Sequence, residues 1–334
     1  MKKALPFILS GASCLLAGAC LLELHGVKSQ LNALKGQNSQ YYSMLQNGIG
    51  DISATVSDQL TQQQSLLAQS SYTYGAVDAE NATVELHYTA VPKEYTPGIT
   101  VAEFHANGTS VPMAYENGQF TAVISLPLFS GTEGTFLTLQ DGDSLRTQAI
   151  DEYFNPQYQV MPDIYVNGYG SSSCVKQDGT LVLTEEQPYL FTFNSNSPDS
   201  PKVQSIDFVI ERNGGEIDRI PVDLTPQGQA ELAASKLWQN VNAQPEMADG
   251  GGYYAVLDTK YPLPAGQNLR VYADVELENG LLCRMLLDSA DADKDGNVIS
   301  SSLDSSMEFW GQPRYIYYAP THKLLWDAVL GEAH

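Results

Sequence analysis

The chain is poor in basic residues. It holds 17 Lys and Arg against 39 Asp and Glu, which gives a formal net charge of −22 over 334 residues. Proteins that bind nucleic acid neutralise phosphates with positive side chains, so this balance excludes nucleic acid as a partner. It also disfavours a body that lies flat on anionic lipid. A surface this acidic keeps a protein soluble and resists self-association.

Cysteine is also scarce. Of the four, Cys14 and Cys20 lie in an apolar N-terminal run, and Cys174 and Cys283 lie in the body. An exported body permits oxidation, so these last two either form a disulfide or stay as buried free thiols. A bridge across so long a span would contribute about 4 to 5 kcal/mol in the chain-entropy model. Both alternatives are open at this point.

Recognisable catalytic motifs are missing. The chain has no His-Glu-x-x-His, no Gly-x-Ser-x-Gly and no Gly-rich phosphate loop followed by Lys and Ser or Thr. Its five His show no spacing suited to a shared metal ion. With 39 carboxylates, many Asp and Glu pairs arise by chance, so a glycosidase pair cannot be recognised. Enzymatic activity is left open, and a non-enzymatic role is favoured.

One apolar run stands at the N-terminus. Residues Ala4 to Leu22 carry no charge; Lys2 and Lys3 precede the run and Glu23 closes it. As a helix this run would span about 28 Å, close to the thickness of a hydrocarbon core. Two positive charges precede the run and none directly follows it, which predicts that the N-terminus stays on the cytoplasmic side of the membrane. We therefore predict a membrane helix within residues 1–24, a single-pass topology and a body outside the cytoplasm.

Two other fates of this run are open. Ala17-Gly18-Ala19 has the small-x-small form of a signal-peptidase site, which would give a secreted protein. Residues 16–20, ending at Cys20, resemble a relaxed bacterial lipobox and would make the chain a lipoprotein lipidated at Cys20. Ala17 stands where that pattern usually has Leu, and the polar tether usual after the Cys is missing. The uncleaved anchor is the preferred interpretation.

Residues 25–70 are rich in Gln, Ser and Asn and contain no Pro. Their apolar residues recur in a heptad-like pattern, although four Gly interrupt the segment. We predict a helical stalk that self-associates as a coiled coil. A lone amphipathic helix packed on the body and a flexible tether are the alternatives. The apolar positions are Val27, Leu31, Leu34, Tyr41, Leu45, Ile52 and Val56.

Residues 71–153 change to a period of two. Short apolar–polar alternations are separated by Asn-Gly and Asp-Gly pairs, a pattern typical of antiparallel hairpins. About seven such strands predict a β-sandwich. The strands Thr83–Tyr88, Gln119–Leu126 and Ser144–Ile150 resemble those of bacterial immunoglobulin-like or fibronectin type III-like modules of cell-surface proteins, without a diagnostic motif. The resemblance implies a spacer or binding module.

Residues 154–334 are predicted to form a second β-rich domain, after a boundary at residues 153–156. Hairpins are expected over residues 174–182, 206–222 and 269–287, and a last strand over 314–318. Between them, residues 226–240 predict an inserted helix with Pro226 in its first turn. Residues 321–330 predict a short C-terminal helix that Thr321 would cap.

One segment resembles a calcium loop. Asp291, Asp293 and Asp295, followed by Gly296 and Asn297, match the spacing of an EF-hand-type loop. The usual Glu at the twelfth position is replaced by Ser, which removes the bidentate ligand. The alternative is an Asp-rich turn between two strands. Calcium is the one cofactor that the sequence suggests.

Aromatic residues gather near Gly-rich loops late in the chain. Tyr253, Tyr254, Trp310 and Tyr315 would form a patch that stacks on sugar rings or anchors a partner protein. In the alternative, successive aromatics on a strand alternate between the core and the surface.

Together these patterns predict a mainly β protein: a membrane helix and helical stalk, then two β-sandwich-like domains, the second with an inserted helix. The expected function is a membrane-anchored extracytoplasmic binding or scaffold protein of the bacterial envelope, with a protein or carbohydrate partner. One alternative is an exported enzyme that acts on polysaccharide or peptidoglycan through carboxylates. Another is an accessory subunit of a membrane complex that docks through its stalk.

Overall fold

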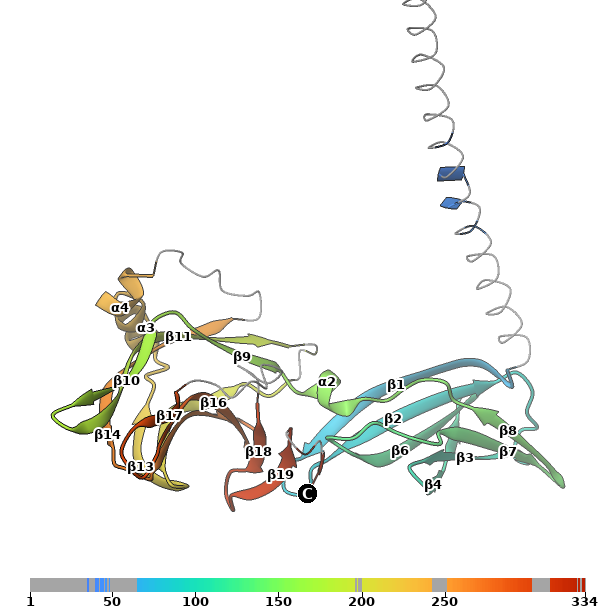
Figure 1. Ribbon diagram of the computed structural model, residues 1–334. Coiled ribbons are helices and arrows are strands. Elements are labelled where there is room, and N and C mark those ends of the chain that lie inside the picture. Colours follow the sequence, from blue (N-terminus) through green and yellow to red (C-terminus); the bar gives the residue numbers. More distant parts are fainter. Residues whose placement is uncertain are drawn as a thin grey trace, which may run out of the picture. The chain divides into compact units, whose positions relative to one another are not determined.

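A computed structural model of the protein describes residues 65–195, 197, 200–241, 251–301, 313–328, 330 and 332–333, with seven residues between 35 and 48 (Figure 1). The chain divides into two compact units, Met1–Leu66 and Leu67–His334. The seven described residues between 35 and 48 are helical. The apolar run with Cys20, and most of the predicted stalk, lie outside the described residues. Within the described residues, no helix has the length and apolar character needed to cross a bilayer.

The protein is mainly β, as predicted, and its strands form four sheets. The two sheets built from residues 67–149 have four antiparallel strands each. One has the order β1 (Leu67–Asp78), β2 (Thr83–Pro92), β6 (Gln119–Pro127) and β5 (Ala114–Glu116). The other has the order β4 (Thr109–Pro112), β3 (Val101–Ala106), β7 (Phe136–Asp141) and β8 (Ser144–Ala149).

Alternating side chains hold these two sheets together in a sandwich-like arrangement. Val84, Leu86 and Tyr88 of β2 are buried, while the residues between them are exposed. The rings of Tyr88 and Phe104, from different sheets, stack with centroids 4.5 Å apart. Phe154, which follows β8 in the sequence, meets the Tyr88 ring edge-on, with the ring centroids 6.3 Å apart. The period of two in the sequence therefore reflects one face of each strand packed into the core.

Strand β1 was not predicted, and it begins four residues before the expected boundary at residue 71. Its sequence lacks a clear alternation because most of its side chains are exposed or half-buried. β1 lies at the edge of its sheet and pairs with β2 alone. An edge strand is specified mainly by its neighbour, which explains the weak signal.

Residues 163–333 form the other two sheets. In the first, β10 (Ser171–Gln177), β11 (Thr180–Asn194) and β14 (Gly252–Leu263) follow in order, and β9 (Asp163–Gly168) also pairs with β11. The second has eight strands. Its main order is β13 (Gly215–Pro221), β12 (Val203–Arg212), β15 (Asn268–Leu277), β16 (Leu281–Ala292), β18 (Tyr315–Tyr318), β19 (Lys323–Asp327) and β20 (Glu332–Ala333), and β17 (Val298–Ser301) pairs with β16.

Aromatic contacts join these two sheets as well. Phe208 of β12 lies between Tyr189 and Phe191 of β11, at centroid distances of 5.4 and 6.2 Å. All three side chains are buried. Among the described strands, none from residues 67–149 pairs with one from residues 163–333. The strand pairing therefore separates residues 67–149 from residues 163–333, although Leu67–His334 form one compact unit.

The predicted inserted helix is present between β13 and β14, in two pieces. Helix α3 (Pro226–Ala233) has Pro in its first turn, and the Thr225 hydroxyl caps it by accepting from the Gly228 N–H at 3.1 Å. Ser235 then starts a second short helix, α4 (Lys236–Gln239). The Trp238 indole N–H donates to the Ala255 carbonyl at 3.2 Å, which fixes α4 on β14.

The predicted C-terminal helix over residues 321–330 is wrong. Lys323–Asp327 form strand β19, which pairs antiparallel with β18. His322 adopts a positive φ of 52° in the turn between the two strands. Pairing with β18 satisfies the backbone of β19 and buries Leu325 completely. Helix propensity is a weak preference that such tertiary pairing readily overrides.

Candidate functional site

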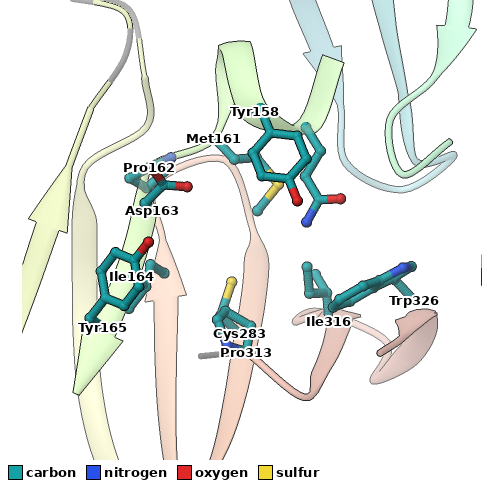
Figure 2. A pocket seen from close by; sticks show the side chains of 11 residues that line it. Tyr158, Met161, Pro162, Asp163, Ile164, Tyr165, Cys283, Pro313, Ile316 and Trp326 are labelled. Atoms are coloured by element: carbon teal, nitrogen blue, oxygen red, sulfur yellow. The ribbon is translucent and has the colours of Figure 1, made fainter. Parts of the chain in front are cut away.

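A small cavity lies in the second β-rich part, between helix α2 (Pro156–Val160) with β9 on one side and the strands β16, β18 and β19 on the other (Figure 2). Its volume is about 230 Å³. The lining combines aromatic rings, aliphatic side chains, one amide and one carboxyl group. The lining residues are Gln157, Tyr158, Met161, Pro162, Asp163, Ile164, Tyr165, Cys283, Pro313, Ile316 and Trp326.

The register of the eight-stranded sheet builds one wall of this cavity. Cys283 on β16 lies opposite Ile316 on β18, and Ile316 lies opposite Trp326 on β19. Residues that face one another across adjacent strands project to the same side of a sheet, so these three side chains form a row. Figure 2 shows them below Met161 and Tyr158 of the opposite wall. The wall therefore depends on β19 being a strand.

Cys283 forms part of the cavity floor as an unreactive thiol. It is a free, fully buried cysteine. Burial raises the pKa of its thiol to about 12, and the negative charge of Asp274 acts in the same direction. A thiol with so high a pKa stays protonated near neutral pH and is a poor nucleophile. Covalent catalysis by this cysteine is therefore disfavoured.

Asp163 is the one carboxyl group among the described residues that line the cavity. It lies at the start of β9 and is half-buried. Burial raises the pKa of its carboxyl group. The part of the lining that the structure describes contains no Lys, Arg or His. The described lining therefore holds a single carboxyl group in a partly desolvated, aromatic environment.

The predicted calcium loop forms the turn between β16 and β17. The Arg270 guanidinium donates to both carboxylate oxygens of Asp291, at 3.0 and 3.2 Å. Asp293 accepts the backbone N–H groups of Asp295 and Asn297 at 2.9 and 2.7 Å, which lowers the pKa of its carboxyl group. Within the described part of the chain, no three acidic, His or Cys side chains gather in a way that suits a metal ion. Three of the four proposed ligands therefore have other hydrogen-bonding roles.

The disulfide that the sequence allowed is not formed in the structure. Cys174 and Cys283 are free thiols on β10 and β16, which belong to different sheets. Burial, with a smaller effect of the Asp288 charge, raises the pKa of the Cys174 thiol. The alternative of two free thiols describes the structure.

The proposed aromatic patch does not assemble from its described members. Tyr253 and Tyr254 are neighbours on β14, and Tyr315 lies on β18 in a different sheet. The Tyr253 ring meets Phe193 at 5.8 Å, while the Tyr254 ring meets Trp238 at 4.8 Å. The fourth member, Trp310, lies outside the described residues.

Sequence reasoning missed the residues that form the cavity. Asp163 belongs to no motif, and Tyr158 and Trp326 are far apart in the sequence. The one available signal was the aromatic-rich boundary before Pro156, which the structure shows leading into α2.

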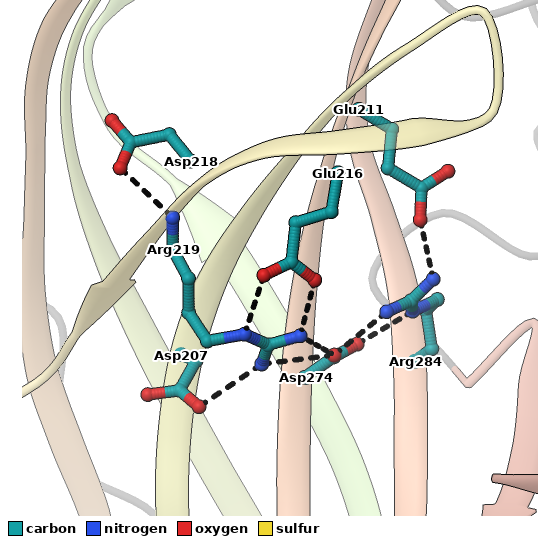
Figure 3. A network of polar contacts seen from close by, with 7 residues as sticks. All are labelled: Asp207, Glu211, Glu216, Asp218, Arg219, Asp274 and Arg284. Atoms are coloured by element: carbon teal, nitrogen blue, oxygen red, sulfur yellow. Dashed lines mark hydrogen bonds and ion pairs between the residues drawn. The ribbon is translucent and has the colours of Figure 1, made fainter.

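A network of two arginines and four carboxylates ties together strands β12, β13, β15 and β16 (Figure 3). Arg284 contacts Asp274 and also donates to Glu211 at 2.7 Å. Arg219 forms ion pairs with Glu216 at 2.7 Å, Asp207 at 3.1 Å and Asp274 at 3.4 Å. Each of these two arginines and four carboxylates has an oppositely charged partner, so the arrangement suits a structural role better than proton transfer. Asp218, which Figure 3 also draws, accepts the backbone N–H of Arg219 at 2.9 Å.

A second polar cluster is sealed between the sheets. Glu185 on β11 is 0% exposed and Asp288 on β16 is 4% exposed. The pKa of Glu185 is raised to about 9, mainly by burial. The hydrogen bond to Asp288 and the negative charge of that residue raise it further. Glu185 Oε1 and Asp288 Oδ2 find no donor within the described residues. One proton between these two carboxyl groups would satisfy both oxygens, and the raised pKa of Glu185 favours its neutral form at pH 7.

Comparison with known proteins finds no family model that matches the chain and no matching curated protein.

Proposed function

We propose that this protein is a membrane-anchored binding protein that works outside the cytoplasm and holds a small ligand in the cavity between α2 and β19. The anchoring part of the proposal is supported by the uncharged run Ala4 to Leu22 and by the two lysines before it. The binding part is carried by one observation: a cavity of about 230 Å³ whose lining joins three aromatic rings to a single carboxyl group. Concave sites with apolar walls and few polar groups are the usual form of small-molecule sites.

The lining favours binding over hydrolysis. Glycosidases of the usual type need two carboxyl groups, separated by about 5 to 9.5 Å, that act as acid and as base or nucleophile. Among the described residues of the cavity, Asp163 is the one acid. The other ionisable side chains of the lining are Cys283 and two tyrosines, and the Cys283 thiol is held protonated. The described residues of the lining thus form no pair suited to general acid and base catalysis.

The size of the cavity limits the ligand. Sites for drug-sized molecules usually have volumes of about 300 to 1,000 Å³. A cavity of about 230 Å³ is smaller and suits one ring or a short-chain molecule. The flat faces of Tyr and Trp provide apolar contact, while the Gln157 amide and the Asp163 carboxyl group provide polar contact.

Tryptophan fluorescence tests whether the cavity admits small molecules. The chain has three Trp, so Trp238→Phe combined with Trp310→Phe leaves Trp326 as the one reporter. We expect acrylamide to quench Trp326 efficiently, because its ring lines the cavity. The matched control leaves Trp238, which is 2% exposed and should be quenched weakly. Far-ultraviolet circular dichroism verifies that both variants are folded. Equal, weak quenching of the two reporters would show a closed cavity and refute the proposal.

If either double variant fails to fold, the parent chain labelled with 5-fluorotryptophan provides the same comparison. Single Trp→Phe variants assign its three fluorine signals, and a soluble neutral nitroxide replaces acrylamide. The signal of Trp326 should broaden more than that of Trp238.

A further inference from the structure

We infer that the ligand of this cavity is a small organic cation, whose ammonium group pairs with Asp163 and contacts the surrounding Tyr and Trp rings. This inference depends on the proposed binding function and names the chemical class of the ligand.

The charge of the cavity lining favours a positively charged ligand. Asp163 is the only formally charged side chain among the described residues of the lining, and no basic residue there neutralises it. Figure 2 shows its carboxyl group beside the cavity, at the end of the wall formed by β9. Burial disfavours its ionised form, as the raised pKa of this group indicates. A positively charged ligand would offset this cost of ionisation, because an opposite charge nearby stabilises a carboxylate.

The aromatic residues of the lining also favour a positively charged ligand. Tyr158, Tyr165 and Trp326 all line the same cavity. Ring faces carry partial negative charge and attract ammonium groups, by about 0.5 to 2 kcal/mol per contact. A cavity that holds both a carboxylate and such rings favours an ammonium ion over a neutral or anionic molecule. The sulfur of Met161 and the Ile316 side chain offer apolar contact to the alkyl part of the ligand.

A metal ion fits the lining less well. Hard cations such as Ca²⁺ take six to eight oxygen ligands, and structural Zn²⁺ takes four ligands that are mostly Cys and His. The described lining provides one carboxylate, the Gln157 amide oxygen, two tyrosine hydroxyls and a protonated thiol, which is fewer charged ligands than these ions usually have. An organic cation needs fewer direct ligands because its remaining surface is apolar.

Choline and its neutral isostere 3,3-dimethylbutan-1-ol separate charge from shape. We propose titrating both into the full chain, labelled with 5-fluorotryptophan and held in maltoside micelles, while the fluorine signal of Trp326 is followed. We expect choline to shift this signal saturably, with an affinity at least about tenfold above that of the alcohol. Phosphocholine detergents and lipids must be absent, because their headgroups would compete.

Two variants locate the charge. Asp163→Asn should weaken choline binding by about tenfold and leave binding of the alcohol unchanged. Asp178→Asn is the control, since it removes the same charge from an exposed turn residue with a positive φ of 48°, a conformation that Asn accepts. It should leave both affinities unchanged.

The other outcomes are distinct. Equal binding of choline and the alcohol, insensitive to Asp163→Asn, would show a neutral apolar site and overturn the cation inference while preserving the binding function. No response to either compound, with Trp326 still open to acrylamide, would also overturn the inference. Equal loss of choline binding in both Asn variants would mean that the total charge of the protein attracts choline, and would refute a site at Asp163.

Discussion

Arg284 on β16 binds Asp274 on β15 through both carboxylate oxygens, at 2.7 and 2.8 Å. The two residues lie directly opposite one another in the antiparallel register. Asp274 is 1% exposed, so this pairing replaces the water that its charge would otherwise need. The Arg284 guanidinium also lies 5.1 Å from the Tyr272 ring and 5.7 Å from the Tyr317 ring. One arginine thus connects the inner strands of the eight-stranded sheet to β18.

Removal of this guanidinium should be costly. We expect Arg284→Met to lower the free energy of unfolding by about 3 to 5 kcal/mol, because Asp274 would stay buried without its main partner. Chemical denaturation measures the change. The double variant with Asp274→Asn should be more stable than Arg284→Met alone, since it no longer buries an unpaired charge. Arg146→Met is the control: its pair with the exposed Glu94, at 3.7 Å, should contribute less than about 1 kcal/mol. A similar, small loss in both arginine variants would contradict the structural role of Arg284.

The buried pair of Glu185 and Asp288 predicts an unusual dependence of stability on pH. In the folded chain the pKa of Glu185 is about 9, whereas in the unfolded chain it has the ordinary value of 4.5. The contribution of the Glu185 proton to stability is therefore complete below about pH 4.5 and declines as the pH rises toward 9. The decline should reach at most about 1.4 kcal/mol per pH unit for one proton.

Glu185→Gln should flatten this decline, because the amide cannot ionise. Glu186→Gln is the matched control, since Glu186 is the exposed neighbour on the same strand and its loss should keep the parental pH dependence. Denaturant midpoints at pH 5, 7 and 8.5 measure all three proteins. Parallel pH profiles for the parent and Glu185→Gln would show that Glu185 is not the group that titrates.

The turn at Asp293 should be weakened by substitution whether or not calcium is added. Asp293 accepts two backbone N–H groups and the Asn297 side-chain amide, so Asp293→Ala should lower the thermal midpoint in calcium-free buffer. Asp293→Asn retains one acceptor oxygen and should lower it less. We expect calcium to shift the midpoint of the parent and of Asp293→Ala equally. A calcium-dependent rise in the parent that disappears in Asp293→Ala would instead establish a calcium site.

The proposed topology has its own test. Protease added to intact cells without an outer membrane should digest the body, because Lys2 and Lys3 precede the apolar run and would hold the N-terminus inside. Cys20→Ala should leave the protein in the membrane fraction, since the run is long enough to anchor it without lipid. Protection of the body until lysis would refute export. Release of Cys20→Ala into the medium would indicate a lipoprotein.

Local sequence patterns determined most of the strands and the helix start. The alternation from Thr83 to Ala90 predicted β2. The two Asn-Gly pairs predicted the turns that join β3 to β4 and β5 to β6, where Asn107 and Asn117 adopt positive φ values of 50° and 52°. Pro226 predicted the start of α3. These features involve residues close in sequence, whose conformation depends on side-chain periodicity and turn chemistry.

The tertiary structure alone decided the rest, because it depends on which distant segments meet. Lys323–Asp327 became a strand because β18 was available to pair with it, and this pairing placed Trp326 in the cavity wall opposite Tyr158. Asp291, which fits a calcium loop by spacing, instead binds Arg270 on the adjacent strand. The placement of Asp163 and Trp326 in the lining of one cavity, and of Glu185 beside Asp288, follows from sheet order and register, which local periodicity does not encode.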